Sequence, residues 1–306
     1  MTPPHFYAVS PQLTGWPHYL TSLFRFHLGL LVLISLIILP CFTVNAENTK
    51  NKYTQHKQKQ HSEYVRKRFL RLMKQPFKEN DESNQATKKQ RKILLIGDSH
   101  AQDFLNAIVE NRFLKNDQIR TRYIPTRCQI YLGSDLQNRW LRTDLALCKK
   151  SDNLRLALNQ ITQADVIILA AFWRKWAAES LSKTIQKLSL TKNQKLFVIG
   201  RRSFKKVDQN KSHKLNTRQR RSLRNTVDIN QEEINHIMVN TLNKNVFVNV
   251  HKTICGAKSN CPAYTDRLKP ISFDGGHLSQ DGARYFGHQL FYRSQLRQLL
   301  KEPLIK

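Results

Sequence analysis

Short apolar runs that alternate with amphipathic stretches after Lys92 restrict the fold of this chain more than any other feature. Five runs have the length and the branched side chains of buried strands: Ile93–Ile96, Ile119–Ile124, Val166–Ala171, Leu196–Ile199 and Val246–Val250. Helical patterns lie between or after them, at residues 101–114, 152–162, 177–190, 229–243 and 279–300. Such alternation requires right-handed crossovers and a parallel sheet covered by helices on both faces. The sequence therefore predicts one doubly wound α/β domain over residues 91–306.

The only long apolar run, Leu28–Leu39, lies near the N-terminus and ends at Pro40. Its twelve residues are too few to span a bilayer, but the segment extends to the small residue Ala46, with Val44 two positions before it. This pattern is typical of the end of a secretory signal peptide. We expect residues 1–46 to form a signal peptide or a membrane anchor that places the remainder outside the cytoplasm. A buried core helix is the alternative.

Charge restricts the class of partner. The chain holds 51 Lys+Arg against 22 Asp+Glu, a formal net charge of +29, while 40% hydrophobic residues still suffice to bury a core. This balance excludes full disorder and a multi-pass membrane protein. A positive charge of this size attracts polyanions, such as nucleic acid, anionic lipid headgroups or acidic envelope polymers.

Much of the positive charge lies in two segments. The first basic segment, residues 47–92, has 14 Lys+Arg and 5 acidic residues, a net charge of +9 (14 − 5). We expect residues 47–90 to form a solvated linker between the N-terminal segment and the domain. Within it, three apolar residues have the spacing of a short helix over residues 64–73: Val65, Phe69 and Leu72.

The second basic segment, residues 201–224, follows the fourth predicted strand and has ten Lys+Arg and one acid, again a net charge of +9 (10 − 1). Its composition predicts a loop without an apolar face. A loop at the carboxyl end of a strand can border an active site. We therefore expect four of its arginines to contact an anionic glycan: Arg218, Arg220, Arg221 and Arg224. A solvated insertion that points elsewhere is the alternative.

Four cysteines follow the N-terminal segment in two pairs, Cys128 with Cys148 and Cys255 with Cys261. Four cysteines allow three pairings, and neither pair has the CxxC spacing or the neighbouring histidine cluster of a zinc site. We expect both pairs to form loop-closing disulfides in an oxidising compartment, and we expect no metal. Four buried thiols are the alternative.

The turn after the first predicted strand, Gly97-Asp98-Ser99-His100, lies where doubly wound sheets hold their chemistry. Gly97 permits a sharp turn, so that Ser99 would stand at the top of the sheet and at the N-terminus of the following helix. There, backbone N–H groups and the helix dipole can stabilise a developing oxyanion. An ordinary helix N-cap is the alternative.

A second motif, Asp274-Gly275-Gly276-His277-Leu278-Ser279, immediately precedes the last predicted helix. A serine hydroxyl is a weak nucleophile until a base takes its proton. His277 is a candidate base for Ser99, and Asp274 can hold its other ring nitrogen and stabilise the imidazolium. The two motifs together predict nucleophilic catalysis, whereas a lone surface histidine is the alternative.

These two motifs, the second followed by Gly282-Ala283, resemble those of the SGNH hydrolase superfamily. Residues 90–300 are most similar to the SGNH domains fused behind the membrane-embedded acyltransferase domains of bacterial cell-surface glycan modification systems. The ADVIILAAFW strand and the cysteine pair ahead of the second motif share in this resemblance. It implies a flavodoxin-like three-layer sandwich with a five-stranded parallel sheet. It also implies that Ser99 is the nucleophile, His277 the base and Asp274 its orienting partner.

The chain departs from the superfamily in a Gly-x-Asn-Asp block, whose Asn donates to the oxyanion hole, because Ala171-Phe172-Trp173-Arg174 stands in that place. The backbone N–H of Ser99 then needs a second donor, for which Gly133 and Arg174 are the candidates. The resemblance also implies a fused membrane domain, whereas this sequence shows a single apolar run. We expect either a stand-alone exported enzyme or one supplied by a separately encoded membrane acyl-donor protein.

Three functions are compatible with these features. The first is an exported SGNH enzyme that moves an O-acyl group, acetyl above all, on an anionic cell-envelope polysaccharide through an acyl-Ser99 intermediate. The second is a lipolytic or small-ester hydrolase, but residues 262–272 do not supply the apolar pocket that it needs. The third is a non-enzymatic polyanion-binding protein. We favour the first and expect neither a cofactor nor a nucleic-acid partner, because aromatic residues are not interleaved with the basic runs.

Overall fold

The fold is known from a computed structural model that describes residues 56, 58–79, 90–208, 212 and 214–301. The described residues from 58 onward belong to one unit, Lys57–Lys306. The predicted signal peptide or anchor at residues 1–46 lies outside the described residues. Within the described part of the chain, no helix combines the length and the apolar character needed to cross a membrane.

Five parallel strands form the central sheet in the order β2-β1-β3-β4-β6. Their bounds are Lys92–Gly97 (β1), Gln118–Tyr123 (β2), Val166–Ala170 (β3), Lys195–Ile199 (β4) and Phe247–Val248 (β6). Each strand lies where an apolar run predicts it. The strand order reverses beside β1, so the carboxyl ends of β1 and β3 border the crevice in which such sheets bind ligands. The flavodoxin-like parallel sheet is confirmed.

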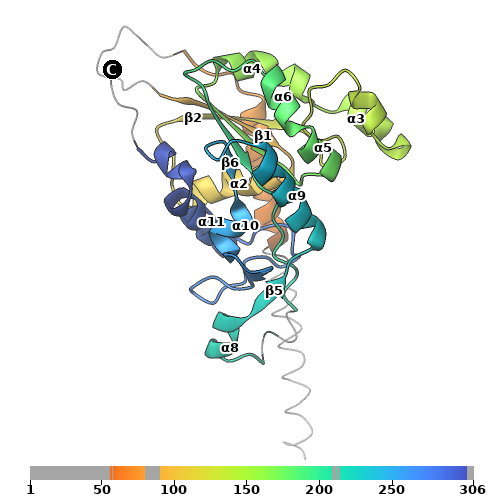
Figure 1. Cartoon of the computed structure of the whole chain (residues 1–306). Coiled ribbons are helices and arrows are strands. Elements are labelled where there is room, and N and C mark those ends of the chain that lie inside the picture. Colours follow the sequence, from red (N-terminus) through yellow and green to blue (C-terminus); the bar gives the residue numbers. More distant parts are fainter. Residues whose placement is uncertain (1–55, 57, 80–89, 209–211, 213, 302–306) are drawn as a thin grey trace, which may run out of the picture. The chain divides into compact units, whose positions relative to one another are not determined.

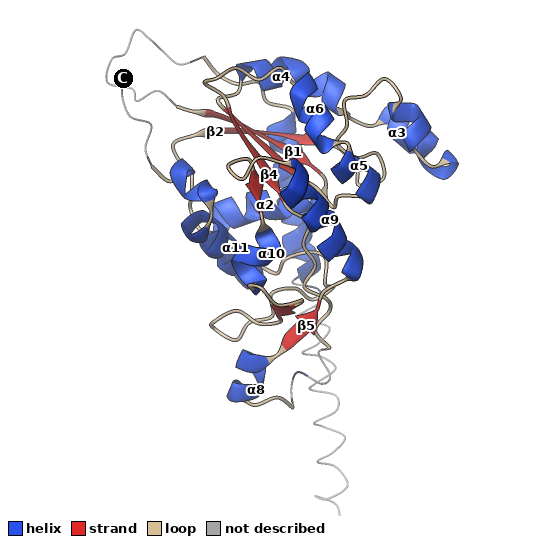
Figure 2. Cartoon of the chain, in the orientation of Figure 1, coloured by secondary structure: helices blue, strands red, loops and turns tan. Residues whose placement is uncertain are grey.

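Helices cover both faces of this sheet and complete three layers (Figure 2). One face carries α2 (Ser99–Glu110), α10 (Val250–Cys255) and α11 (Gln280–Arg293), and the other carries α4 (Leu158–Gln163), α5 (Lys175–Glu179), α6 (Leu181–Lys187) and α9 (Ile229–Thr241). Alternate side chains of β1 explain the arrangement, because Ile93 and Leu95 pack with the first set and Leu94 and Ile96 with the second. Burial of each such side chain contributes about 1.5–3 kcal/mol, so both helical layers stabilise the strand. The short elements are α3 (Leu145–Lys150) and the 3-10 helices Leu136–Arg139, Arg142–Asp144, Leu154–Ala157 and Gln295–Leu299.

The second basic segment is more ordered than its composition predicts. It contains α8 (Thr217–Ser222) and ends at the first residue of β5 (Arg224–Thr226), which pairs antiparallel with β7 (Asn260–Pro262) in a two-stranded sheet of its own (Figure 1). Each strand has only three residues, so no apolar alternation predicts it from the sequence. The guanidinium of Arg224 holds the pair together through hydrogen bonds to the side chain and the backbone carbonyl of Asn260, at 2.5 and 2.8 Å.

The first basic segment contributes a helix, residues 58–73, to the domain. Phe69 is fully buried in the core and Val65 is 7% exposed, as their helical spacing predicts. Thr121 on β2 donates a 2.6 Å hydrogen bond to the backbone carbonyl of Phe69, which ties the helix to the edge of the sheet. The expected linker over residues 47–90 therefore needs correction, because this part of it packs on the domain.

Both expected disulfides are present. Cys128–Cys148 links the loop after β2 to α3, and Cys255–Cys261 links the end of α10 to β7, with Cα–Cα distances of 5.3 and 4.5 Å. The predicted pairing is confirmed. Closing the longer loop stabilises the fold by on the order of 3 kcal/mol in the chain-entropy account.

Candidate active site

The turn after β1 places Ser99 at the carboxyl edge of the sheet. Gly97 is required there because a Cβ atom at this position would lie 1.8 Å from the backbone carbonyl oxygen of Ala170 on β3. Asp98 then caps α2 by accepting a 2.9 Å hydrogen bond from the backbone N–H of His100. Ser99 occupies the first helical position, where N–H groups lack helical partners and the dipole favours negative charge. Its partial exposure leaves the hydroxyl accessible.

The buried carboxylate of Asp98 joins the three loops that meet at this edge. One oxygen accepts hydrogen bonds from Thr126 Oγ1, in the loop after β2, at 2.7 Å and from the backbone N–H of Phe172, after β3, at 2.9 Å. Burial raises the pKa of Asp98 above its usual value, and its hydrogen bonds oppose the rise. Asp98 therefore fixes the neighbouring Ser99 relative to the loops around it.

Asp274 and His277 form a hydrogen-bonded pair in the turn before α11, with 2.6 Å between Asp274 Oδ2 and His277 Nδ1. Asp274 Oδ1 accepts from the backbone N–H groups of Gly276 and His277, at 2.9 and 2.8 Å, so the turn itself orients the carboxylate. Burial opposes ionisation, but the hydrogen bonds from His277 outweigh it and hold the pKa of Asp274 well below its usual range. The same hydrogen bond raises the pKa of His277, against the effect of burial.

Ser99 and His277 line the same small pocket, of about 30 Å³. The helix over residues 58–73 contributes His61, Ser62 and Val65 to its lining. The predicted nucleophile and base, which lie near opposite ends of the domain sequence, are thus brought to one cavity.

A buried ion pair between Asp103 on α2 and Arg202 after β4 supports the turn of His277. The two side chains are 9% and 3% exposed. Arg202 also donates a 2.8 Å hydrogen bond to the backbone carbonyl of Gly276, and Asp103 accepts one of 3.2 Å from the backbone N–H of Leu278. The pair therefore holds the residues on both sides of His277.

Buried charges around this ion pair set the protonation of the site. Burial raises the pKa of Asp103, and the guanidinium of Arg202 opposes the rise. Burial lowers the pKa of His100 well below its usual value, and the positive charges of Arg202, His277 and Arg201 lower it further. His100 is therefore a neutral imidazole, and its ring packs edge-on against the ring of Phe172.

Sequence analysis missed both members of the ion pair, although a signal existed for each. Asp103 lies one helical turn after Ser99 and so shares its face of α2. Arg202 stands just beyond the carboxyl end of β4, where functional side chains gather in this type of sheet. Arg202 lies within a run of positive charge, and side chains in such runs are usually solvated, so nothing in the sequence distinguishes it as buried.

The two candidate oxyanion donors, Arg174 and Gly133, lie outside the pocket of Ser99 and His277. The guanidinium of Arg174 lies 3.8 Å from the carboxylate of Asp144. Gly133 is buried, and a Cβ atom there would collide with the ring of Tyr131 at 2.3 Å or less. Among the described residues that line the pocket of the serine and the histidine, neither candidate occurs.

The four arginines expected to contact a glycan differ in exposure. Arg218 and Arg221 are exposed on α8. Arg220 donates a 3.1 Å hydrogen bond to a backbone carbonyl of the same basic segment. Arg224, besides holding the small sheet together, donates to the backbone carbonyl of Cys255 at 2.6 Å. Only the first two of these four side chains are therefore both exposed and without a hydrogen bond to the described protein.

One group of described residues, His251, Cys255 and Cys261, has its potential ligand atoms close enough together for a metal ion. The two sulfur atoms are joined in a disulfide, however, and a metal requires thiolates. The chemistry of this donor set does not fit a metal, and we assign it no ligand role.

The strand order, the serine after β1 and the Asp-x-x-His turn before the last helix define an SGNH hydrolase fold. The chain belongs to the family of SGNH domains fused to AT3 domains, whose family model matches residues 54–291. Membership supports an esterase or acyltransferase activity of the SGNH type. A similar solved structure is the periplasmic domain of a Salmonella ser. Paratyphi A lipopolysaccharide acetyltransferase, with TM-score 0.46 and 17% identity, covering 68% of this chain and 84% of that chain. No curated protein matches the sequence.

Proposed function

We propose that the protein is an extracytoplasmic, serine-dependent O-acyltransferase or esterase that moves acetyl groups on a cell-envelope polysaccharide. One observation carries the proposal: Ser99 and His277 line one pocket, and His277 is hydrogen-bonded to Asp274. Family membership supports the class of reaction. The two disulfides support a location in an oxidising compartment.

In the proposed first half-reaction, Ser99 Oγ attacks the acyl carbonyl carbon while His277 Nε2 takes the hydroxyl proton. The tetrahedral intermediate collapses, the alcohol leaves with the proton that His277 returns, and the acyl group remains on Ser99 as an ester. Asp274 keeps the proton on Nδ1 and stabilises the imidazolium. The N-terminus of α2 and the backbone N–H of Ser99 stabilise the oxyanion.

In the second half-reaction, a sugar hydroxyl or water attacks the acyl-serine, and His277 takes the proton of the attacking oxygen. Attack by a sugar hydroxyl makes the protein a transferase, and attack by water makes it an esterase. Because the family is described by its fusion to AT3 domains, the proposal includes a membrane acyl-donor partner.

The lining of the catalytic pocket argues against a lipolytic enzyme. A lipolytic enzyme needs a broad apolar cavity beside its serine, whereas this pocket of about 30 Å³ is lined mainly by polar side chains. A protein that only bound polyanions would have no use for a histidine held by a carboxylate beside a serine at a helix N-terminus.

A fluorophosphonate probe tests the nucleophile and the class together. We expect the probe to label Ser99 of the folded protein and to leave the Ser99→Ala variant unlabelled. Ser62→Ala is the matched control, because Ser62 lines the same pocket, and this variant should be labelled like the parent. Labelling that persists in Ser99→Ala, or a folded parent that takes no label, would exclude the proposed intermediate.

A further inference from the structure

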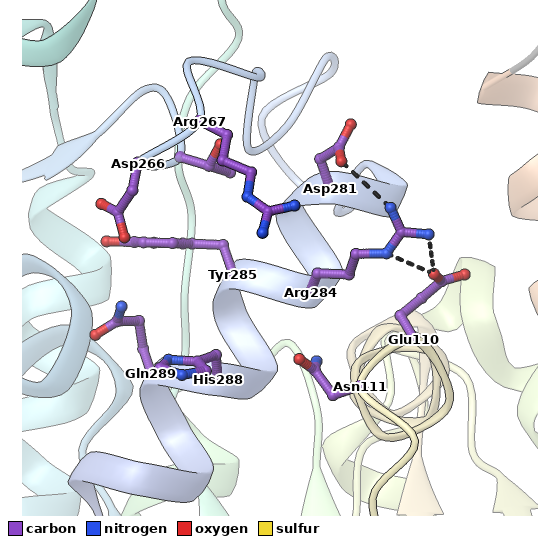
Figure 3. Close-up of a pocket in the computed structure, with 10 residues that line it drawn as sticks. Glu110, Asn111, Asp266, Arg267, Asp281, Arg284, Tyr285, His288 and Gln289 are labelled. Carbon is purple, nitrogen blue, oxygen red and sulfur yellow. Dashed lines mark hydrogen bonds and ion pairs between the residues drawn. The ribbon is translucent and has the colours of Figure 1, made fainter.

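A second and larger pocket, of about 320 Å³, lies between α2, α11 and the hairpin over residues 264–270 (Figure 3). The hairpin is well defined, with hydrogen bonds from the backbone N–H of Thr265 to the carbonyl of Lys269 and from that of Leu268 to the carbonyl of Thr265, both at 2.8 Å. Its tip carries Asp266 and Arg267 to the pocket. The proposed reaction assigns no role to this pocket.

Several polar groups in this second pocket have no partner in the described protein. Gln289 is only 6% exposed, lines the pocket, and forms no side-chain hydrogen bond with any described residue. The amide atoms of Gln289 are still accessible from the pocket, so they offer a free donor and a free acceptor to a polar occupant. Asp266 and Arg267 are exposed and likewise form no hydrogen bond or ion pair with described residues. In Figure 3 the guanidinium of Arg267 is directed over the pocket.

The charges of the second pocket nearly cancel. Arg284 neutralises Glu110 at 2.9 Å and also lies 3.5 Å from Asp281. The remaining carboxylate and guanidinium, on Asp266 and Arg267, are opposite in sign. A phosphorylated or polyanionic ligand would therefore meet carboxylates without a surplus of positive charge, and a cation would meet arginines. The pocket suits a ligand that is polar but uncharged.

The chemistry of the lining narrows this ligand to a saccharide. Carboxylates accept hydrogen bonds, guanidinium groups donate them, and the amide of Gln289 can do both, which matches hydroxyl groups that donate and accept at once. Asn111 adds an acceptor oxygen, because its amide nitrogen already donates to the backbone carbonyls of Ala107 and Ala283. The half-buried ring of Tyr285 adds an apolar wall with a polar tip, which suits the C–H face of a sugar ring.

The second pocket lies along the same pair of helices as the catalytic pocket. Ser99, Gln102, Asp103 and Asn106 line the catalytic pocket and Glu110 lines the second one, and their spacing of three or four residues places them on one face of α2. The eleven steps along α2 from Ser99 to Glu110 span about 16 Å at 1.5 Å each. A chain of a few sugar units is long enough to reach from one pocket to the other.

We propose that the second pocket is a subsite that holds one saccharide unit of the acceptor polysaccharide while another unit reacts at Ser99. This inference rests on the proposed function and adds how the polymer is positioned. The subsite contributes binding energy and takes no part in the chemistry, so its loss raises KM for the polymer and leaves the turnover of small esters unchanged.

The test uses the full chain and the envelope polysaccharide of the cell that makes it. Acetate release is measured on the native polymer, and acetyl transfer from p-nitrophenyl acetate is measured on the de-O-acetylated polymer. For Arg267→Gln and Tyr285→Ala we expect KM for the polymer to rise about ten-fold or more, with p-nitrophenyl acetate turnover unchanged. Arg297→Gln, which removes an exposed arginine outside the pocket, is the matched control and should behave like the parent.

Each outcome separates the two proposals. If the parent acts on the polymer and both variants match it, the subsite is wrong and the proposed function stands. If the parent turns over p-nitrophenyl acetate but neither acylates nor deacylates the polymer, the proposed polysaccharide function is wrong, and the subsite is overturned with it. Because Arg267 is exposed at a hairpin tip, its replacement does not threaten folding, so the test does not depend on a core variant.

Discussion

The two basic segments have the same net charge, yet they meet the domain in different ways. The first attaches through apolar side chains: Phe69 is buried in the core, while His61 and Ser62 on the same helix line the catalytic pocket. The second attaches through a buried charge as well as an apolar side chain: Arg202 is buried beside Asp103 and Phe204 lies in the core, before the segment continues to the exposed α8. Net charge therefore predicts neither burial nor solvation, because individual neighbours decide the position of each side chain.

Arg201 illustrates how the second segment buries positive charge. Its guanidinium lies 3.9 Å from the ring centroid of Phe172 and donates a 3.2 Å hydrogen bond to the backbone carbonyl of Trp173. Aromatic faces and carbonyls thus replace part of the hydration that the cation loses. Burial lowers the pKa of Arg201 somewhat, but a guanidinium remains protonated.

Replacing the proposed nucleophile or base should reduce activity more than any other substitution. Ser99→Ala and His277→Ala should lower kcat/KM for p-nitrophenyl acetate on the order of 10⁴-fold, with Asp274→Ala less severe, since an orienting carboxylate leaves some activity. Circular dichroism should show that the variants remain folded. Unchanged turnover in the Ser99 variant would show that Ser99 is not the nucleophile and that this pocket is not the active site.

A single arginine in the second segment should separate buried from solvated charge. Arg202→Gln leaves Asp103 buried without its partner and should lower the free energy of unfolding by about 3–5 kcal/mol, measured by chemical denaturation. Arg221→Gln removes the same charge from the exposed α8 and should change it by no more than about 0.5 kcal/mol. Combining Arg202→Gln with Asp103→Asn should recover part of the loss. If Arg202→Gln and Arg221→Gln changed the free energy of unfolding equally, the distinction between a buried and a solvated arginine in this segment would be wrong.

In the first segment, the corresponding test replaces a buried apolar side chain. Phe69→Ala creates a cavity in the core and should cost about 3–5 kcal/mol of unfolding free energy, with a loss of esterase activity as the pocket wall loosens. Tyr64→Ala is the matched control, because Tyr64 is 55% exposed on the same helix. If Phe69→Ala leaves the free energy of unfolding unchanged, residues 47–90 are a spacer, as the sequence predicts.

The pH dependence should follow the nearest carboxylate and not the net charge. Asp274 raises the pKa of His277, so the protonated, inactive base persists above the ordinary histidine value of about 6.5, and kcat/KM should rise as the pH increases through this raised pKa. Asp274→Asn removes the first cause of the rise, so the acid limb should move to lower pH while kcat falls. Glu63→Gln, which removes an exposed acid of the first segment, should leave the limb in place.

The smallest expected effect belongs to the exposed part of the second segment. Replacing Arg218 and Arg221 with Gln should weaken binding of an acidic envelope glycan a few-fold at low salt and flatten its salt dependence. The reason is screening, because the Debye length falls from about 10 Å at 0.1 M to about 3 Å at 1 M salt. Turnover of p-nitrophenyl acetate should not change. Unaltered glycan binding at low salt would identify α8 as a solvated insertion.

Much of the fold could be predicted because its signals are local. The strands of the central sheet are covered on both faces, so they appear in the sequence as continuous apolar runs such as Leu94–Ile96. The strands β5 and β7 escaped prediction because each has only three residues, which is too short for a periodic pattern. The candidate oxyanion donors Gly133 and Arg174 do not line the pocket of Ser99 and His277, and their role stays a prediction.

The sequence by itself determined the parallel sheet, the position of Ser99 at the end of β1 and the pairing of His277 with Asp274. Each depends on residues that are close along the chain: an apolar run, a glycine turn, a three-residue spacing. Only the tertiary structure decided that Ser99 meets His277, that Arg202 joins Asp103 and that His61 reaches Asn106 at 3.0 Å. These contacts arise where helices and loops from distant parts of the chain pack together, and packing is a property of complementary surfaces that no short stretch of sequence contains.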